Sequence, residues 1–270
     1  MTSRSKIERV DGNRGRFYRI RGVEYPSVTT VLSVIGKPAL TAWAAKVERE
    51  MVIVEAGKLY DALHGQEKVS SLKWTSLLTQ QLGKEKAHSK ELAKAGEIGS
   101  QVHAMIEWNL KARLLKDVGP APEIGPKAQH AYASWVEWSD KNKLKPLYVE
   151  ETVYSETHQY AGTMDLLAEI DGEPVLLDWK TGKKIYDESL LQNIAYRKAV
   201  EEMGFGKPTK GIIVRLPKIE GDPEFEVREV TENPKELFSV FLSAYDLWKW
   251  CNKKVCDVQT RTADEQLSQK

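Results

Sequence analysis

The stretch GTMDLLAEIDGEPVLLDWKTG, residues 162–182, contains two apolar runs joined by a two-residue turn signal. Asp171-Gly172 is a dipeptide that tight β-hairpin turns prefer. Asp165 precedes this turn by six residues and Asp178 follows it by six. Because hairpin pairing is symmetric about the turn, the sequence predicts that these two aspartates face each other on neighbouring strands.

Two facing carboxylates are a destabilising arrangement unless something compensates for their charge. Facing side chains lie about 4.5–5.5 Å apart, and like charges at that spacing repel. A divalent cation such as Mg²⁺ compensates, because hard cations bind carboxylate oxygens. Lys180 is two residues beyond Asp178 and shares its face, whereas Trp179 points to the core. The sequence therefore predicts two acids and a lysine that converge at the edge of a sheet.

Composition is compatible with one sizeable core plus a helical insertion. The chain has 270 residues, of which 41% are hydrophobic and 29% are charged. The formal net charge is only +1, so bulk charge does not indicate a nucleic-acid binder. The basic residues are unevenly placed, however, with one group before residue 22 and another at Lys183 and Lys184. Two interpretations stay open, a solvated basic surface and a surface that contacts phosphates.

The cysteine count and the hydropathy pattern exclude several classes of protein. Cys251 and Cys256 are the only cysteines, which rules out a four-thiolate iron–sulfur cluster or zinc site. The start, MTSRSKIERV, has no apolar signal region, and no run approaches the roughly 20 apolar residues that span a bilayer. We expect an intracellular protein without membrane contact, with both thiols reduced on a C-terminal helix.

Hydrophobic periodicity predicts the other elements of the chain. Besides the hairpin, strands are expected over 147–154, 211–216 and 225–230, and a smaller hairpin over 16–25. Ser27 is expected to cap a helix that breaks at Pro38. Further helices are expected over 40–54, 55–95, 95–115, 128–141, 187–203 and 234–254. This order predicts a mixed central sheet covered by helices, after a helical N-terminal segment.

Two helices carry further candidate residues. His103 lies beside an apolar stripe, with Glu107 one turn later. A histidine there is either a metal ligand or an ordinary partly buried residue. Gln192 and Tyr196 are four residues apart and share a helix face. They either hydrogen-bond a phosphate or a catalytic lysine, or they belong to a solvated helix surface.

Taken together, the motifs resemble those of the RecB-like branch of the PD-(D/E)XK nuclease superfamily. They are Gly-Thr-x-Asp at 162–165, Asp-x-Lys-Thr-Gly at 178–182, Gln-x-x-x-Tyr at 192–196 and the histidine helix at 99–107. A fifth segment, 25–32, is similar to the N-terminal segment of the mitochondrial genome-maintenance exonuclease group and its phage relatives. The resemblance implies an α/β fold, a restriction-endonuclease-like core with a mixed central sheet flanked by helices.

The resemblance covers residues 25–32 and 96–217 and implies a domain division. Residues 1–95 are expected to form an N-terminal hairpin and helical segment that makes a DNA channel. Residues 96–256 are expected to form the nuclease core, and 257–270 a polar, frayed tail. In the channel, Trp43 and Trp74 either stack on bases or are buried core residues.

The resemblance also implies residue roles. The metal ligands are expected to be His103, Asp165, Asp178 and the carbonyl of Trp179. The catalytic residues are expected to be Lys180, Asp178, Asp165 and the strand acid Glu151, with the adjacent Glu150 as the alternative. Substrate contacts are expected from Gln192, Tyr196, Thr181 and Lys183. The implied cofactor is Mg²⁺ or Mn²⁺, and a histidine ligand favours Mn²⁺.

These roles predict a metal-dependent deoxyribonuclease that hydrolyses phosphodiester bonds, an exonuclease on single-stranded or end-frayed DNA. The expected setting is replication, recombination or repair in the cytoplasm of a bacterial or phage-infected cell, with proteins of those processes as partners. The alternatives are a structure-specific endonuclease and a non-catalytic DNA-binding module on the same fold. A small-molecule enzyme is disfavoured, because no strand-to-helix turn carries a glycine-rich phosphate loop.

Overall fold

The computed structural model describes residues 7–63, 69–84, 86–114, 117–219, 222 and 225–267, except for the side chains of 253–267. The chain divides into two compact units. One contains residues 1–35 and 99–270, and the other contains residues 36–98. The expected boundary at residue 95 is close to the division after residue 98, but residues 1–35 belong with the sheet rather than with the helical residues that follow them.

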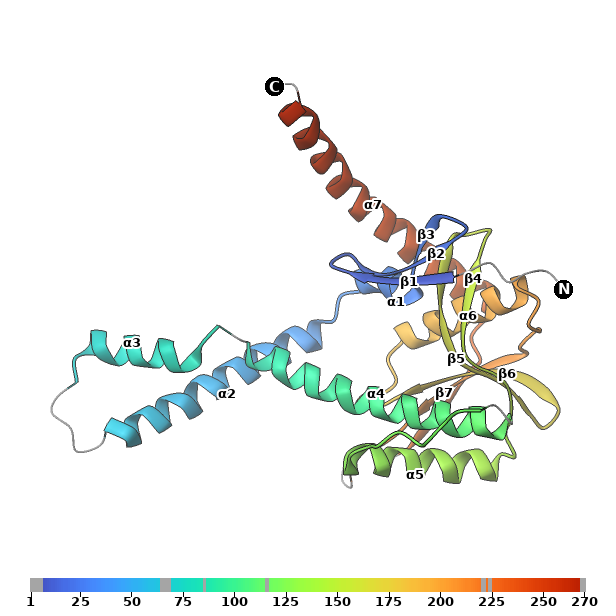
Figure 1. Cartoon of the computed structure of the whole chain (residues 1–270), viewed down its shortest axis with the longest axis horizontal. Coiled ribbons are helices and arrows are strands. Elements are labelled where there is room, and N and C mark those ends of the chain that lie inside the picture. Colours follow the sequence, from blue (N-terminus) through green and yellow to red (C-terminus); the bar gives the residue numbers. More distant parts are fainter. Residues whose placement is uncertain are drawn as a thin grey trace. The chain divides into compact units, whose positions relative to one another are not determined.

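Within the described residues, the larger unit contains a five-stranded sheet in the order β4-β5-β6-β7-β8 (Figure 1). The strands are β4 (Lys145–Ser155), β5 (Tyr160–Ile170), β6 (Glu173–Lys180), β7 (Lys210–Arg215) and β8 (Glu226–Val230). β6 and β7 run parallel, whereas the other neighbouring pairs are antiparallel. The mixed α/β sheet flanked by helices confirms the predicted fold class.

The predicted hairpin between β5 and β6 is confirmed. Asp171 and Gly172 have φ values of 51° and 83°, the conformation that a tight turn of this kind requires. Pairing runs from Ile170 and Glu173 at the turn to Leu166 and Leu177. It ends one position before Asp165 and Asp178, while β6 remains paired with β7 as far as its end. The two aspartates therefore stand where β5 and β6 diverge.

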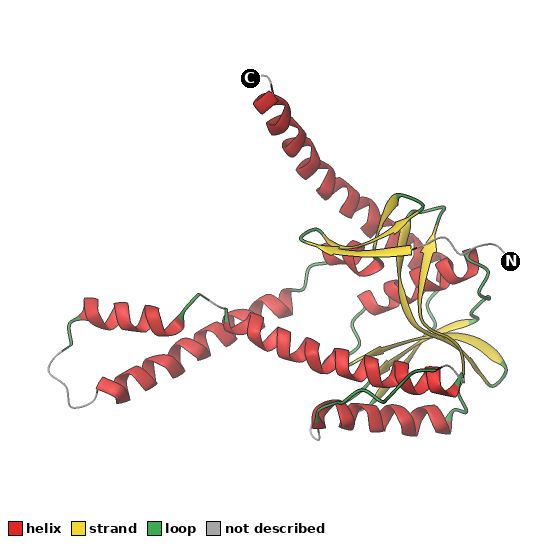
Figure 2. Ribbon diagram, viewed as in Figure 1, coloured by secondary structure: helices red, strands yellow, loops and turns green. Residues whose placement is uncertain are grey.

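Helices cover both faces of this sheet (Figure 2). On one face Trp179 of β6 packs on Trp135 of α5 (Pro126–Lys141), with ring centroids 5.0 Å apart. On the other face Leu176 of β6 shares a core cluster with residues of α6 (Glu188–Glu202) and α7 (Pro234–Leu267). Residues 176 and 179 face opposite ways because side chains alternate along a strand. α7 stays helical to Leu267, so the expected tail is helical where it is described.

A three-stranded antiparallel sheet precedes the core in the described chain, formed by β1 (Ile7–Gly12), β2 (Gly15–Ile20) and β3 (Val23–Pro26). It is followed by α1 (Val28–Val31) and the 3-10 helix η1 (Leu32–Val34). The predicted cap is confirmed, because Ser27 Oγ accepts a 3.0 Å hydrogen bond from the Thr30 N–H. Ser27 also forms an isolated bridge with Ala161, which attaches this sheet to the start of β5.

The smaller unit is helical. It contains α2 (Pro38–Leu63), α3 (Ser71–Leu82) and the first part of α4 (Ala87–Arg113). Glu48 accepts a 3.1 Å hydrogen bond from the backbone N–H of His88 and lies 2.6 Å from its ring nitrogen. Trp43 and Trp74 are half-buried. Among the described residues no single helix is long and apolar enough to span a membrane, although the bent pair 28–34 and 38–63 has the length and composition together.

Candidate active site

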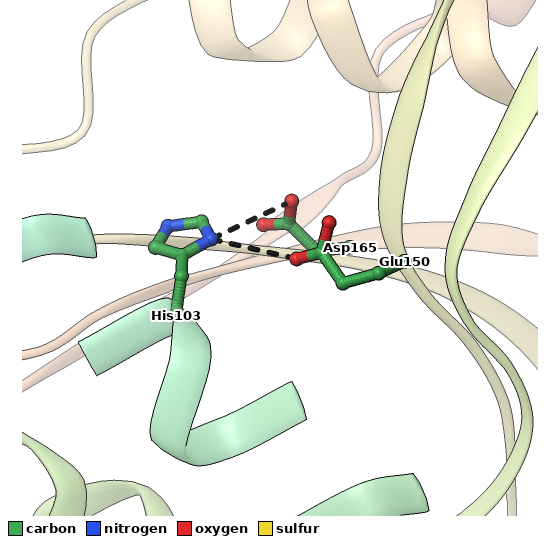
Figure 3. A group of neighbouring side chains, drawn as sticks. All are labelled: His103, Glu150 and Asp165. Carbon is green, nitrogen blue, oxygen red and sulfur yellow. Dashed lines mark ion pairs between the residues drawn. The ribbon is translucent and has the colours of Figure 1, made fainter. Parts of the chain in front are cut away.

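Three side chains from different elements meet where β5 diverges from β6. His103 comes from α4, Glu150 from β4 and Asp165 from β5, and one potential ligand atom of each lies within 4.8 Å of the others. Nδ1 of His103 is 3.7 Å from Glu150 Oε1 and 3.9 Å from Asp165 Oδ1 (Figure 3). An imidazole nitrogen with two carboxylates is a donor set that suits a divalent metal ion.

Glu150, rather than Glu151, is the strand acid of this cluster. Val149 pairs with Leu166 and Glu151 with Met164, which places Glu150 opposite Asp165. Glu150 has a φ of 50°, an uncommon conformation that turns its side chain away from strict strand alternation. The geometry thus places Glu150, the alternative strand acid, in the cluster, and a catalytic role for Glu151 stays a prediction.

Asp178 and Lys180 form a second group beside this cluster. Nζ of Lys180 lies 2.7 Å from Asp178 Oδ1, to which it donates a hydrogen bond, and 2.6 Å from Oδ2. It also donates to Gln192 Oε1 at 3.2 Å, and Gln192 Nε2 is 3.5 Å from the Tyr196 hydroxyl. The structure thus brings together the predicted lysine, glutamine and tyrosine. The lysine is held between an acid and an amide.

The predicted opposition of Asp165 and Asp178 is modified by the divergence of their strands. Oδ2 of Asp165 accepts a 3.0 Å hydrogen bond from the backbone N–H of Trp179. Asp178, with its carboxylate on Lys180, lies outside the three-residue cluster. Asp178 still feels the charge of Asp165, which adds to the rise in its pKa that burial causes. Metal ligation by Asp178 and by the Trp179 carbonyl stays a prediction.

Burial and charge shift the pKa values of all four central groups. Burial raises the pKa of Asp178 to about 6, against the opposing charge of Lys180. Burial also raises the pKa of Asp165. For His103 and Lys180, burial alone would lower the pKa, but the surrounding carboxylates outweigh it and both pKa values are raised. Ionisation of Asp165 and Asp178 is therefore unfavourable, whereas His103 and Lys180 hold their protons more tightly. An additional positive charge in the site would stabilise the ionised form of both acids.

The sequence comparisons agree with this geometry. Residues 70–251, more than half of the chain, match the family model of the PD-(D/E)XK nuclease superfamily. The chain belongs to this superfamily. Its nucleases use divalent metal ions and act on DNA, and the cluster of His103, Glu150 and Asp165 fits that cofactor.

Two solved structures with similarity to the chain are distant from it in sequence. A crystal structure of a candidate exonuclease from Eubacterium rectale is 15% identical, with 74% of this chain and 79% of that chain covered and a TM-score of 0.39. The protein SSO0001 is 11% identical, with 56% and 74% covered and a TM-score of 0.29. No curated protein matches the chain. Membership of the RecB-like branch stays a prediction.

The remaining predicted residues lie on α4, which carries His103, or in the loop after β6, which follows Lys180. Thr181 packs against α4, because a Cβ atom on Gly99 would lie 3.1 Å from its Oγ1. Lys183 is exposed in the loop after β6. Glu107, one turn after His103 on α4, is paired with Lys111.

Several cations gather at the carboxyl ends of the parallel strands β6 and β7. Burial lowers the pKa of Lys218, and the charges of Lys127, Arg215 and Lys183 lower it further against the opposing charge of Asp222. Arg215 donates a 3.0 Å hydrogen bond to the carbonyl of Gly182, in the loop that follows Lys180. This local excess of positive charge beside a nuclease site favours a polyanionic ligand.

Two contacts of the site were not among the predictions from the sequence. The ring of Tyr196 lies against the backbone of Gly162, so a Cβ atom there would be 2.5 Å from its Cε1. The hydroxyl of Tyr18, from the N-terminal sheet, is 2.9 Å from Thr163 Oγ1. The glycine of the Gly-Thr-x-Asp motif was a visible signal for close packing. Tyr18 carried no comparable signal, because its partner is far away in sequence.

Proposed function

We propose that this nuclease is a metal-dependent deoxyribonuclease that acts as an exonuclease on single-stranded or end-frayed DNA. The observation that carries the proposal is the adjacency of two groups. A potential metal cluster of His103, Glu150 and Asp165 lies beside the ion pair between the buried Asp178 and the partly buried Lys180. The five-motif resemblance to exonucleases supports the finer assignment, and the cations near Lys183 support a polyanionic substrate.

The residues have distinct tasks in phosphodiester hydrolysis. His103, Glu150 and Asp165 would hold a divalent ion, Mg²⁺ or Mn²⁺, with Asp178 as the further candidate ligand. When bound, such an ion supplies Lewis-acid chemistry, which polarises the phosphate and favours ionisation of a water molecule. The ammonium group of Lys180 orients the attacking water and offsets the negative charge that develops on the phosphate oxygens. Asp178 and Gln192 fix the position of that ammonium group.

The test uses end-labelled oligonucleotides incubated with MgCl₂ or MnCl₂. Wild-type protein should release mononucleotides or short products, and chelation of the metal should stop the reaction. Lys180→Ala should lower kcat by about 10²–10³-fold, as loss of a transition-state charge contact does elsewhere. Absence of cleavage by wild type under every condition, or full activity of Lys180→Ala, would reject the proposal.

A covalently closed single-stranded circle separates the exonuclease from the structure-specific endonuclease. An exonuclease leaves the circle intact and degrades it after one nick, whereas an endonuclease opens it directly. The non-catalytic alternative predicts DNA binding without metal-dependent turnover. It is disfavoured because Asp165, Asp178 and Lys180 are all present and mutually close.

The helical residues 36–98 are proposed to contact the DNA strand. Trp43 and Trp74 are half-buried, so each retains surface on which a base can stack. Their substitution by alanine should raise KM for long oligonucleotides more than for dinucleotides. We further propose that the enzyme works in the cytoplasm of a bacterial or phage-infected cell, in replication, recombination or repair.

A further inference from the structure

The N-terminal sheet contributes side chains beside the nuclease site. Ala161 of β5 shares a small apolar cluster with Tyr18 and Ile20 of β2. Two residues further along β5, Thr163 lies 2.9 Å from the hydroxyl of Tyr18. The backbone of Arg16 is close to the same part of β5, because its carbonyl accepts a 2.9 Å hydrogen bond from the N–H of Ser27, the residue that bridges Ala161.

Arg16 is the basic residue of β2 that lies on the side of Tyr18. Arg16 and Tyr18 share a face because side chains alternate along a strand. The guanidinium lies within electrostatic reach of the hydroxyls of Tyr18 and Tyr196. Its side chain is 39% exposed, so it remains accessible to a ligand. On β5 the residue beyond Thr163 on the same face is Asp165, a member of the metal cluster.

The ion pair of Arg16 is one that a phosphate can replace. Asp11, directly opposite on β1, accepts a 3.0 Å hydrogen bond from Arg16 Nε. The Asp11 side chain is 55% exposed, and its other oxygen, Oδ2, lies 2.7 Å from Arg9 Nε. Exposed pairs of this kind contribute little stability. A phosphate offers the planar guanidinium two acceptor oxygens, which makes a stronger, bidentate contact.

We propose that Arg16 binds the non-bridging oxygens of the phosphate next to the scissile one on the DNA strand. Arg16 lies within electrostatic reach of the Tyr18 hydroxyl, which contacts Thr163. Thr163 is two residues, about 6.7 Å along β5, from Asp165 of the metal cluster, a step comparable to the spacing of successive phosphates in an extended strand. The inference rests on the proposed function and deepens it, because it assigns the neighbouring phosphate to the N-terminal sheet.

The experiment combines protein variants with a chemically altered substrate. Single-stranded oligonucleotides carry one methylphosphonate, which removes the charge of a single phosphate, placed in turn at each position near the labelled end. Wild type should lose about tenfold in kcat/KM at the position next to the scissile bond. Arg16→Ala should lose about tenfold on unmodified DNA and nothing more from that methylphosphonate, whereas Arg16→Lys should recover part of the loss.

Two further variants separate a phosphate contact from a structural role. Arg19→Ala is the matched control, because Arg19 is on the same strand but faces the other way and pairs with Glu8 and Glu24. It should behave as wild type. Asp11→Asn should lower KM, because a carboxylate that competes with phosphate is removed. If the Arg16–Asp11 pair were only structural, both of its variants would raise KM.

The outcomes distinguish the inference from the proposed function. If wild type cleaves DNA but Arg16→Ala and the neighbouring methylphosphonate reduce kcat/KM independently, the inference is overturned and the proposed function stands. Equal losses for Arg16→Ala and Arg19→Ala would overturn it as well. Failure of wild type to cleave any nucleic acid would overturn both. Thermal unfolding and circular dichroism of each variant identify any loss caused by misfolding, and Arg16→Lys then provides the comparison.

Discussion

Glu150 and Asp165 occupy facing positions on β4 and β5, and both carboxylates lie within 4 Å of the same nitrogen, Nδ1 of His103. Facing like charges on a sheet repel each other unless a cation lies between them. The positive φ of Glu150, 50°, adds a backbone cost that the fold sustains here. Repulsion and strain at one point identify the place where a bound divalent ion would stabilise the protein most.

The adjacent acids Glu150 and Glu151 provide a matched pair for testing the metal site. Glu150→Gln should weaken Mn²⁺ binding by at least about tenfold, because it removes one carboxylate from the cluster. Glu151→Gln makes the same chemical change one residue away and should leave binding close to that of wild type. Isothermal titration calorimetry with MnCl₂ measures both. Equal affinities for the two variants would contradict the assignment of Glu150.

The pKa of Asp178, raised to about 6 mainly by burial, predicts opposite pH trends with and without metal. A carboxyl group whose folded pKa is raised stabilises the fold in its protonated form. That contribution is present below about pH 4 and is lost as the pH rises through about 6. A divalent ion requires ionised ligands, so its stabilising effect should appear over the same rise.

Thermal unfolding between pH 5 and 8, with and without MnCl₂, measures these trends. The increase in Tm caused by Mn²⁺ should be small at pH 5 and large at pH 7.5. The acid limb of kcat/KM should move to lower pH as the Mn²⁺ concentration rises, because metal and proton compete for the same carboxylates. An increase in Tm that is the same at both pH values would show that the ion binds elsewhere.

The hairpin was predictable from sequence because its information is local. Asp171-Gly172 specifies the turn, and the register of Leu166 with Leu177 follows from it. Ser27 was predictable as a cap for the same reason, since its partner Thr30 is three residues away. Local chemistry therefore located Asp165, Asp178 and their strands correctly.

The site itself depends on contacts that local chemistry does not specify. β4 and β5 are joined through residues 156–159, which carry no two-residue turn signal, so the register that places Glu150 opposite Asp165 was hidden. The divergence of β5 from β6 depends on how β6 pairs with β7, far along the chain. This divergence lets Asp165 reach the N–H of Trp179 instead of standing square to Asp178.

Gly162 is predicted to be indispensable because Tyr196 fills the space beside it. A Cβ atom on residue 162 would lie 2.5 Å from the Tyr196 ring, closer than packed atoms come. Gly162→Ala should therefore lower the free energy of unfolding by about 1–3 kcal/mol, the usual cost of overpacking. Chemical denaturation measures the change.

Gly182→Ala is the control for that substitution. A Cβ atom on Gly182 has its nearest neighbour at 3.7 Å, an ordinary contact. The unfolding free energy of Gly182→Ala should stay within about 0.5 kcal/mol of wild type. Combining Gly162→Ala with Tyr196→Ala should recover stability relative to the sum of the single changes, because the clash is removed. Additive losses would show that the clash with the Tyr196 ring is not the cause of the instability of Gly162→Ala.

The last prediction concerns whether Gln192 acts on Lys180 or on the substrate. Gln192 Oε1 accepts a 3.2 Å hydrogen bond from Lys180 Nζ, whose other acceptor is Asp178. If Gln192 positions the lysine, Gln192→Ala should lower kcat by about three- to tenfold, the worth of one hydrogen bond, with KM little changed. Gln192→Glu should lower kcat further, because a second carboxylate beside Lys180 draws its charge away from the phosphate and repels that phosphate.

Lys198→Ala, on the same helix and paired with Glu201, controls for general effects on α6. Single-turnover cleavage of a labelled oligonucleotide separates the chemical step from binding. A raised KM with unchanged kcat in Gln192→Ala would instead show that Gln192 binds the DNA directly. Lys180 would then be held by Asp178 alone, through a contact that protonation of Asp178 would weaken. In that case activity would fall at low pH for two reasons. Protonation of Asp178 would weaken its contact with Lys180, and protonation of the metal ligands would release the metal ion.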